Sequence, residues 1–459
     1  MNVTPRLVPP RCAARAQGFG RWPAAFASRF FLALVAGFVW LGPAWWDARF
    51  GYMVLVWDVL VMGIWWWDWS RLPRPEQLEI SRQWGEAVSL GSTCQVTLEM
   101  SAKSGVGVIA SLEDEVPASL RPQTPKEEVV VPPGRTGSIT YHIQPRERGD
   151  ARLGRVFIRY RSPLQFAERR AVADLNQVVR IYPNLEEGKK MQLYLLRSRQ
   201  IELEKRLQHH PGRGREFESL REYRDGDELR DICWTATARR ARLVTKVHRP
   251  ERSQSVILVV DAGRLMLARS GLFSKLDFAV TAALSLAHVA MAGGDAVGMI
   301  AYGRRIQAQL KASRGRHHLR SILEQLAMVR GELAEADHAR AAETLLKGQS
   351  RRCLVVWITD LAETAATPEV IESARRLLSR HLVLFVAMGQ PNLRSFLARR
   401  PETSGEMYRY AAGLELVQRR EMLLRRLREQ GALAAEIAPG RLAVGLVNHY
   451  LKIKEESLL

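Results

Sequence analysis

The sequence predicts an α/β domain with a doubly wound, mostly parallel sheet over residues 253–455, preceded by a β-rich domain and by two apolar helices. Three observations support this prediction. After residue 253, apolar strand-like runs alternate with amphipathic helical segments. Between residues 76 and 185, short runs rich in Val, Ile and Thr are separated by Gly, Pro and Asn. Before residue 70, two apolar runs are each long enough to cross a bilayer.

The N-terminal part predicts a transmembrane helical hairpin within residues 30–70. The runs FFLALVAGFVWLGPAWW and FGYMVLVWDVLVMGIWWW would each form a helix about 26 Å long, at ~1.5 Å per residue. Ten of the 12 tryptophans precede residue 85, and tryptophan prefers the membrane–water interface. A cleaved signal peptide is the alternative, but a second apolar run follows the first at once. Asp58, within the second run, is expected to face the partner helix or a second copy of the chain.

Basic residues flank this hairpin on both sides. Residues 1–29 form a basic N-terminus with arginines and no acid, and Arg71 and Arg74 follow the second run. Basic residues favour the cytoplasmic side of a membrane. We therefore expect both termini, and the bulk of the chain, in the cytoplasm.

Residues 76–185 predict an antiparallel, sandwich-like domain, because regular short strands with turns between them are typical of that architecture. No His, Cys or carboxylate cluster with the spacing of metal ligands occurs there. A binding or spacer module is the expected role.

Two strands of the predicted α/β domain end in aspartate, at Asp261 and Asp360. This pattern resembles the von Willebrand factor A domain, a Rossmann-like fold in which D-x-S-x-S, a loop threonine and a second aspartate hold Mg²⁺ through oxygen ligands. Here Gly263 and Leu265 replace the two serines. The resemblance therefore implies a degenerate site, and we expect no cofactor. The alternative is a divalent-metal-dependent adhesion module that uses Asp261 and Asp360.

The loop that would supply the threonine is expected at SRGRHHL, where the nearest matches are Arg316 and His317, and Ser313 is the nearby hydroxyl. In the metal-free interpretation, Asp261 orders the loop at the sheet edge. Arg264 or Arg316 would neutralise its charge.

Residues 186–252 form a linker and a charged segment, GREFESLREYRDGDELRDICWTATARR, between the two domains. Its pattern is similar to the signature of a bacterial and archaeal family, domain of unknown function family 58. The matching positions are Leu220, Arg221, Glu222, Tyr223, Gly226, Asp227, Arg230, Ile232, Trp234, Ala238 and Arg239.

The resemblance extends over roughly residues 75–450 and implies membrane anchorage in the bacterial inner membrane. It also implies a MoxR-type AAA ATPase and an unknown client protein as partners. Two roles are open for the signature residues: an ion-pair knot that joins two domains, with Trp234 packed beneath the α/β domain, or a docking surface for a partner.

The net charge and the motifs of the sequence limit the classes of function that we expect. The net charge of +20 is compatible with an anionic membrane surface or an acidic partner. No recognisable nucleic-acid-binding module accompanies the charge, so we expect no nucleic acid partner. The sequence contains no Walker A, G-x-S-x-G or H-E-x-x-H motif. We therefore expect an interaction protein rather than an enzyme, able to associate with further copies of itself.

Overall fold

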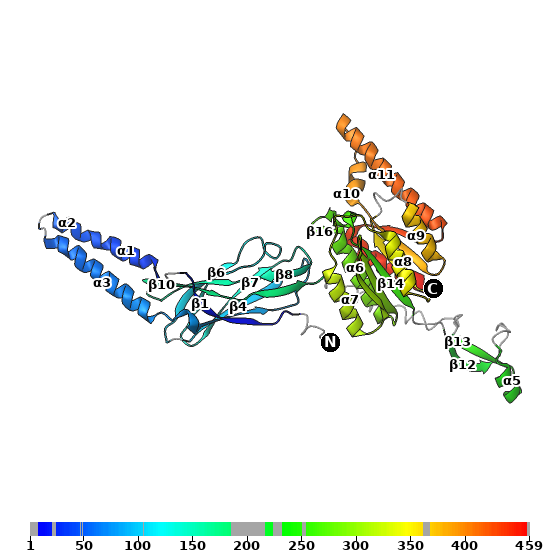
Figure 1. Ribbon diagram of the computed structural model, residues 1–459, viewed down its shortest axis with the longest axis horizontal. Helices are drawn as coiled ribbons and strands as arrows, with labels where there is room; N and C mark the ends of the chain where they lie inside the picture. The colour runs from blue at the N-terminus through cyan, green and yellow to red at the C-terminus, as the bar shows by residue number, and fades with distance from the viewer. Residues whose placement is uncertain are drawn as a thin grey trace. The chain divides into compact units, whose positions relative to one another are not determined.

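The computed structural model describes residues 8–20, 24–45, 47, 49–103, 105–184, 216–223, 232–249, 254–360 and 368–456. The chain divides into two compact units, residues 1–182 and 183–459. Each unit is described by itself below (Figure 1).

The first unit is built on antiparallel strands. They are β1 (Cys12–Gly18), β2 (Ala24–Phe26), β3 (Leu78–Trp84), β4 (Cys94–Ala102), β5 (Val108–Asp114), β6 (Lys126–Val131), β7 (Thr136–Ile143), β8 (Gly149–Leu153), β9 (Val156–Arg161), β10 (Ala167–Ala173) and β11 (Gln177–Ile181). Nine of them form one sheet in the order β6-β5-β9-β10-β1-β3-β4-β7, with β2 on β10, and β8 pairs with β11. Side chains alternate between buried and exposed along β4 and β7, because successive residues of a strand point to opposite faces. One apolar core results.

Strand β1 lies within the residues that the sequence assigns to a basic N-terminus, where no strand is predicted. Its sequence, CAARAQG, contains no β-branched or aromatic residue, so local propensity does not reveal it. Strand β1 forms because it pairs with strands that are distant in the sequence. Its first half pairs with β3 and its second half with β10, so β1 joins the two halves of what the sequence predicts as a sandwich.

Two apolar helical segments precede the rest of the sheet. The first run is α1 (Ser28–Gly37), a 3₁₀ turn (Phe38–Trp40) and the short α2 (Leu41–Ala44), and the second is α3 (Arg49–Arg71). The first run is thus not one continuous helix. Helix α1 lies beside α3, where the Trp57 Nε1 donates to the Ala33 carbonyl oxygen at 2.8 Å. Gly37 permits this approach, since a Cβ there would lie 2.5 Å from Trp57 Cδ1.

By length and composition, two described helices could span a membrane: residues 50–71 of α3, and α6 (Lys275–Ala292) of the second unit. Helix α6 is mostly buried inside its unit and is therefore a core helix. Only 6% of the apolar window of α3 is buried, which leaves its surface open to lipid.

The second unit contains a six-stranded, mostly parallel sheet. Its strands are β14 (Ser255–Asp261), β17 (Ala296–Tyr302), β18 (Ile306–Ser313), β19 (Leu354–Thr359), β20 (Leu382–Met388) and β21 (Leu433–Ile437), in the order β18-β17-β14-β19-β20-β21. Strand β18 alone runs antiparallel to its neighbour. The central strands are buried along their whole length, as expected when helices cover both faces of a sheet.

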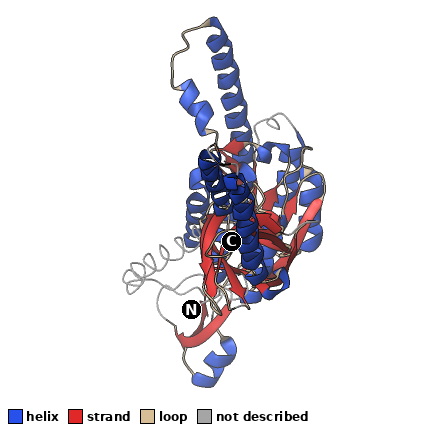
Figure 2. Ribbon diagram, turned by 90° about the vertical axis from the view of Figure 1, so that its left-hand side faces the viewer, coloured by secondary structure: helices blue, strands red, loops and turns tan. Residues whose placement is uncertain are grey.

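The helices of this unit fall on the two faces of the sheet. They are α6, α7 (Arg316–Met328), α8 (His338–Gly348), α9 (Pro368–Leu378), α10 (Pro391–Leu397), α11 (Ser404–Glu429) and α12 (Leu442–Glu455). Side chains of α8, α9 and α11 share one apolar core with the sheet. Helices α7 and α12 pack against α6. Figure 2 shows α11 extending beyond the strands, with the short α10 beside it.

Smaller elements complete this unit. They are the antiparallel pair β12 (Glu216–Glu222) and β13 (Val244–Arg249), helix α5 (Trp234–Arg240), and the two-residue strands β15 (Arg269–Ser270) and β16 (Phe273–Ser274).

Candidate functional site at the C-terminal edge of the α/β sheet

The two strand-end aspartates lie at the same edge of the sheet. Strands β14 and β19 are parallel neighbours, Asp261 is the last residue of β14, and Asp360 follows β19 directly. The chain turns to opposite sides from this strand pair, since β17 lies beyond β14 and β20 beyond β19. Such a switch point is where open α/β sheets bind their ligands.

Asp261 is buried and accepts two hydrogen bonds from its surroundings. The Gly263 amide donates to Oδ1 at 2.7 Å, and the Thr359 hydroxyl donates to Oδ2 at 2.6 Å. Burial raises the pKa of Asp261 above its ordinary value, although the charge of His338 and both hydrogen bonds oppose the rise. The Gly263 bond orders the loop after β14, and the Thr359 bond joins the end of β14 to the end of β19.

Asp360 is buried between two cations of its own chain. The Lys275 ammonium binds Oδ2, and the Arg420 guanidinium lies 3.2 Å from Oδ1. Arg420 also donates to the Met388 carbonyl oxygen, and its Nε lies 3.6 Å from the Glu436 carboxylate. Both cationic side chains are less than a tenth exposed. A buried carboxylate with two cationic partners is part of an internal network rather than an open ligand.

A second buried chain of hydrogen bonds adjoins Asp261. The Trp357 Nε1 donates to the Tyr302 hydroxyl at 2.7 Å, and that hydroxyl lies 2.8 Å from His338 Nδ1. The Tyr302 hydroxyl thus links the Trp357 indole to the His338 ring. The arrangement positions His338 beside Asp261 without leaving a nucleophile exposed.

A small pocket of about 20 Å³ opens at this edge. A water molecule needs roughly 10–15 Å³ of such space, so the pocket fits about one water and no substrate of ordinary size. Its lining residues come from the β14–α6 connection, from the loop before α8 and from the end of β19: Asp261, Gly263, Arg264, Leu265, Glu335, Ala336, His338 and Asp360.

The described residues at this edge do not fit a divalent cation. Among the described residues, no group of three His, Cys, Asp or Glu side chains could hold a metal ion. The Lys275 ammonium contacts the carboxylate that the resemblance assigns to the metal. A serine at position 263 is excluded as well, because a Cβ there would lie 2.9 Å from both the Cβ and the backbone nitrogen of Ala336. Hard divalent cations need several open oxygen ligands, whereas Asp261 is buried and both of its carboxylate oxygens already accept hydrogen bonds.

The expected threonine loop is at the wrong edge of the sheet. Ser313 ends β18 opposite Val297, at the start of β17, whereas Asp261 pairs with Tyr302 at the end of β17. Because β18 is antiparallel to β17, the residues that follow it, including Arg316 and His317, begin at the far edge. The loop that reaches the aspartates is residues 329–337, which bonds to the β14–α6 connection through Glu332 and Ala334 backbone groups.

The predicted neutralisation of Asp261 by arginine is also wrong for Arg264. The Arg264 guanidinium pairs with Glu335 at 3.6 Å, and both side chains are largely exposed. Lys275 and Arg420 pair with the neighbouring carboxylate, Asp360, and not with Asp261.

Sequence reasoning missed Lys275, Arg420 and His338. Lys275 directly follows the N-cap of α6, where Ser274 and Asp277 form a capping box. A lysine at the start of an apolar helix that follows an aspartate-ending strand is a weak but readable signal. Arg420 is one of many arginines in α11, and the sequence offers no mark that separates it from the others.

The signature segment is described in part. Arg221 and Glu222 lie on β12 opposite Thr245 and Val244, and the Tyr223 amide donates to the Leu243 carbonyl oxygen at 2.9 Å. Gly226, Asp227 and Arg230 lie outside the described residues.

Helix α5 carries three further signature residues, Trp234, Ala238 and Arg239, and all three are exposed. Arg239 lies in its last turn, and the side chain of Trp234 is 68% exposed rather than packed beneath a domain. Ile232 is buried, and no hydrogen bond or ion pair joins the described part of this segment to Asp261 or Asp360.

Comparison with known proteins agrees with the sequence signature. The chain is 27% identical over 188 residues to an uncharacterised protein of Mycobacterium tuberculosis, covering 39% of this chain and 57% of that one. It is 24% identical over 230 residues to the uncharacterised protein YeaD of Bacillus subtilis, covering 49% and 54%. The chain thus spans under two thirds of the length of these relatives.

A von Willebrand factor type A structure from Catenulispora acidiphila is 12% identical, with a TM-score of 0.28, and covers 45% of this chain and 43% of that one. Residues 219–396 match the model of the protein family of unknown function DUF58. The resemblance inferred from Leu220 to Arg239 is therefore confirmed: this segment of the chain is similar to the DUF58 family.

Proposed function

We propose that the chain is a membrane-anchored interaction protein without enzymatic activity, whose α/β unit offers the C-terminal edge of its sheet to a protein partner. The state of Asp360 carries this proposal. Its carboxylate is bound by Lys275 and Arg420 of the same chain and is not available to a metal or a substrate. Because Asp360 already has cationic partners, a protein partner would recognise this edge through its shape and its exposed side chains.

The loops around this edge supply such side chains. Leu333 lies in the loop before α8 and is 85% exposed, and Leu272 lies between β15 and β16 and is 67% exposed. Single exposed leucines are ordinary. Leu272 and Arg264 lie on the connection between β14 and α6, and Leu333 and Glu335 lie on the loop before α8, so these two connections present both apolar and charged side chains. That composition is typical of a protein–protein contact.

The DUF58 segment supports the identity of the partner. Similarity to that family implies a MoxR-type AAA ATPase that acts with this chain on a client protein. Helix α3 supports membrane anchorage, because its length and open apolar surface suit a bilayer. A fixed anchor would hold the partner and its client at the membrane.

The test is in-cell crosslinking of the tagged full-length protein, followed by mass spectrometry. We expect crosslinks between an AAA ATPase and residues 263–273 or 329–337. Leu333→Asp should reduce them, because it replaces an exposed apolar side chain of the 329–337 loop by a charge. Leu414→Asp is the matched control, since Leu414 is an exposed leucine of α11. Recovery of envelope proteins without any ATPase, or equal crosslinking by both variants, would contradict the proposal.

A further inference from the structure

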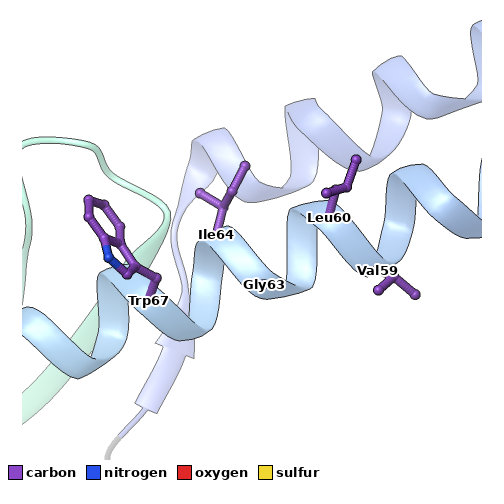
Figure 3. Close-up of a pocket in the computed structure, with 5 residues that line it drawn as sticks. All are labelled: Val59, Leu60, Gly63, Ile64 and Trp67. Carbon is purple, nitrogen blue, oxygen red and sulfur yellow. The ribbon is translucent and has the colours of Figure 1, made fainter.

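Helix α3 carries a shallow apolar groove on its exposed surface. Val59, Leu60, Gly63, Ile64 and Trp67 line it, with a volume of about 340 Å³. Figure 3 shows these residues on successive turns of the helix, with a gap in side chains at Gly63. Gly63 has open space where a Cβ would be, so nothing of the described chain fills the groove there.

The groove ends at a positive charge. Leu60, Ile64, Trp67 and Arg71 recur at steps of four, three and four residues, which keeps them on one face of a helix. The Arg71 guanidinium lies 4.1 Å from the centroid of the Trp67 ring. Among the residues that the structure describes, Arg71 has no carboxylate partner. The nearest acid along the helix, Asp68, is buried and engaged elsewhere.

Asp68 fixes this end of the helix against the first unit. Its Oδ2 accepts from the Ser162 hydroxyl at 2.7 Å and from the amides of Phe166 and Ala167 at 3.2 and 2.9 Å. The Arg169 guanidinium also donates to the Trp69 carbonyl oxygen at 3.0 Å. The rotation of α3 about its axis is therefore set by the β-sheet, and the face with the groove and Arg71 is held in one direction.

We propose that this face binds one anionic phospholipid, with an acyl chain in the groove and the phosphate at Arg71. The apolar lining suits a hydrocarbon chain, and the unpaired guanidinium at its end is complementary to a phosphate. Trp67 lies between them, where an aromatic ring meets both the acyl and the headgroup regions. The inference rests on the membrane anchorage of the proposed function and adds a ligand to the anchor itself.

The experiment uses the full-length protein in membranes of phosphatidylcholine and phosphatidylglycerol at a ratio of about 4:1, a composition in which anionic lipid is the minority. After mild extraction and purification, mass spectrometry counts each lipid bound per chain. We expect phosphatidylglycerol to be enriched over its membrane share by about fivefold, as one arginine at a lipid surface provides. Gly63→Leu, which fills the groove, and Arg71→Gln, which removes the charge, should each abolish the enrichment.

Gly51→Leu is the matched control, because Gly51 also lies on α3 and has open space at its Cβ position. This variant should retain the enrichment. Equal lipid content in all four proteins would overturn the proposal, as would a change of oligomeric state in Gly63→Leu with unchanged lipid, which would place a second copy in the groove. Alkaline carbonate extraction separates the two proposals: release of the chain contradicts the anchor, whereas a retained chain without enrichment contradicts the lipid site alone.

Discussion

Replacing Lys275 by methionine tests the internal neutralisation of Asp360. The methionine keeps most of the apolar stem but removes the ammonium, so the buried carboxylate retains only Arg420, 3.2 Å from Oδ1. Breaking a buried ion pair by removing one partner costs about 3–5 kcal/mol. Because Arg420 remains, we expect the lower end, about 3 kcal/mol of unfolding free energy.

Hydrogen exchange measures this cost within the α/β unit of the full-length protein. The amides of β14 and β19 flank the site and report the opening free energy of the sheet. A loss of about 3 kcal/mol corresponds to more than a 100-fold faster exchange, at about 1.4 kcal/mol per tenfold. Lys347→Met is the control, because Lys347 pairs with Glu343 on the exposed surface of α8, where a salt bridge contributes roughly 0–1 kcal/mol.

A double-mutant cycle decides whether the loss comes from the Lys275–Asp360 pair. Asp360→Asn alone should also destabilise the sheet, since it leaves two buried cations around a neutral amide. The double variant should be less destabilised than the sum of the two, by more than about 1.5 kcal/mol. Exchange in Lys275→Met within a few-fold of the wild-type rate, or additive effects, would refute the reasoning.

Three further predictions concern metal, pH and the C-terminal helix. Mg²⁺ at millimolar concentration, or its removal with a chelator, should leave the melting temperature unchanged, and a rise with Mg²⁺ concentration would revive a metal site. Burial raises the pKa of Asp261 above 3.8, so the folded state binds its proton more readily than the unfolded chain and stability falls as pH rises from about 4 through the raised pKa. Urea unfolding should show a smaller fall in Asp261→Asn, and an identical slope would contradict this. Asp295→Asn should speed exchange in α12 selectively, because Asp295 binds Tyr450 and, at 2.8 Å, Lys454. Uniform exchange across the unit would argue against a local anchor.

The position of Asp261 and Asp360 at strand ends follows from sequence because it depends on one regular feature, the apolar run that forms each strand. Apolar runs mark β14 and β19 clearly, and parallel neighbours in such a sheet end at the same edge. Strand order is not readable from the apolar pattern, so the placement of Asp261 beside Asp360 followed only from the resemblance to the von Willebrand factor A domain. The degenerate metal site at this edge could be predicted from Gly263 and Leu265, which replace the two serines of the motif.

The groups that complete the site are not readable in the same way. Lys275 lies 85 residues before Asp360, and Arg420 lies 60 residues after it. Only the folded topology brings them together. The loop after β18 was misplaced for a related reason, because a strand's direction decides the edge at which the next loop begins, and the apolar pattern of β18 is the same in either direction.

The helix cap that positions Lys275 matters for the function of the C-terminal edge. Ser274 and Asp277 cap α6 through reciprocal bonds of 3.2 and 2.9 Å, which fix the first turn and hence the direction of Lys275. A metal ion at such an edge is taken from solution, so its occupancy varies with supply. An ammonium set by a helix cap is present whenever the sheet is folded. Asp360 therefore keeps its ammonium partner whenever the sheet is folded, and under the proposed function a partner at this edge would respond to the fold rather than to metal concentration.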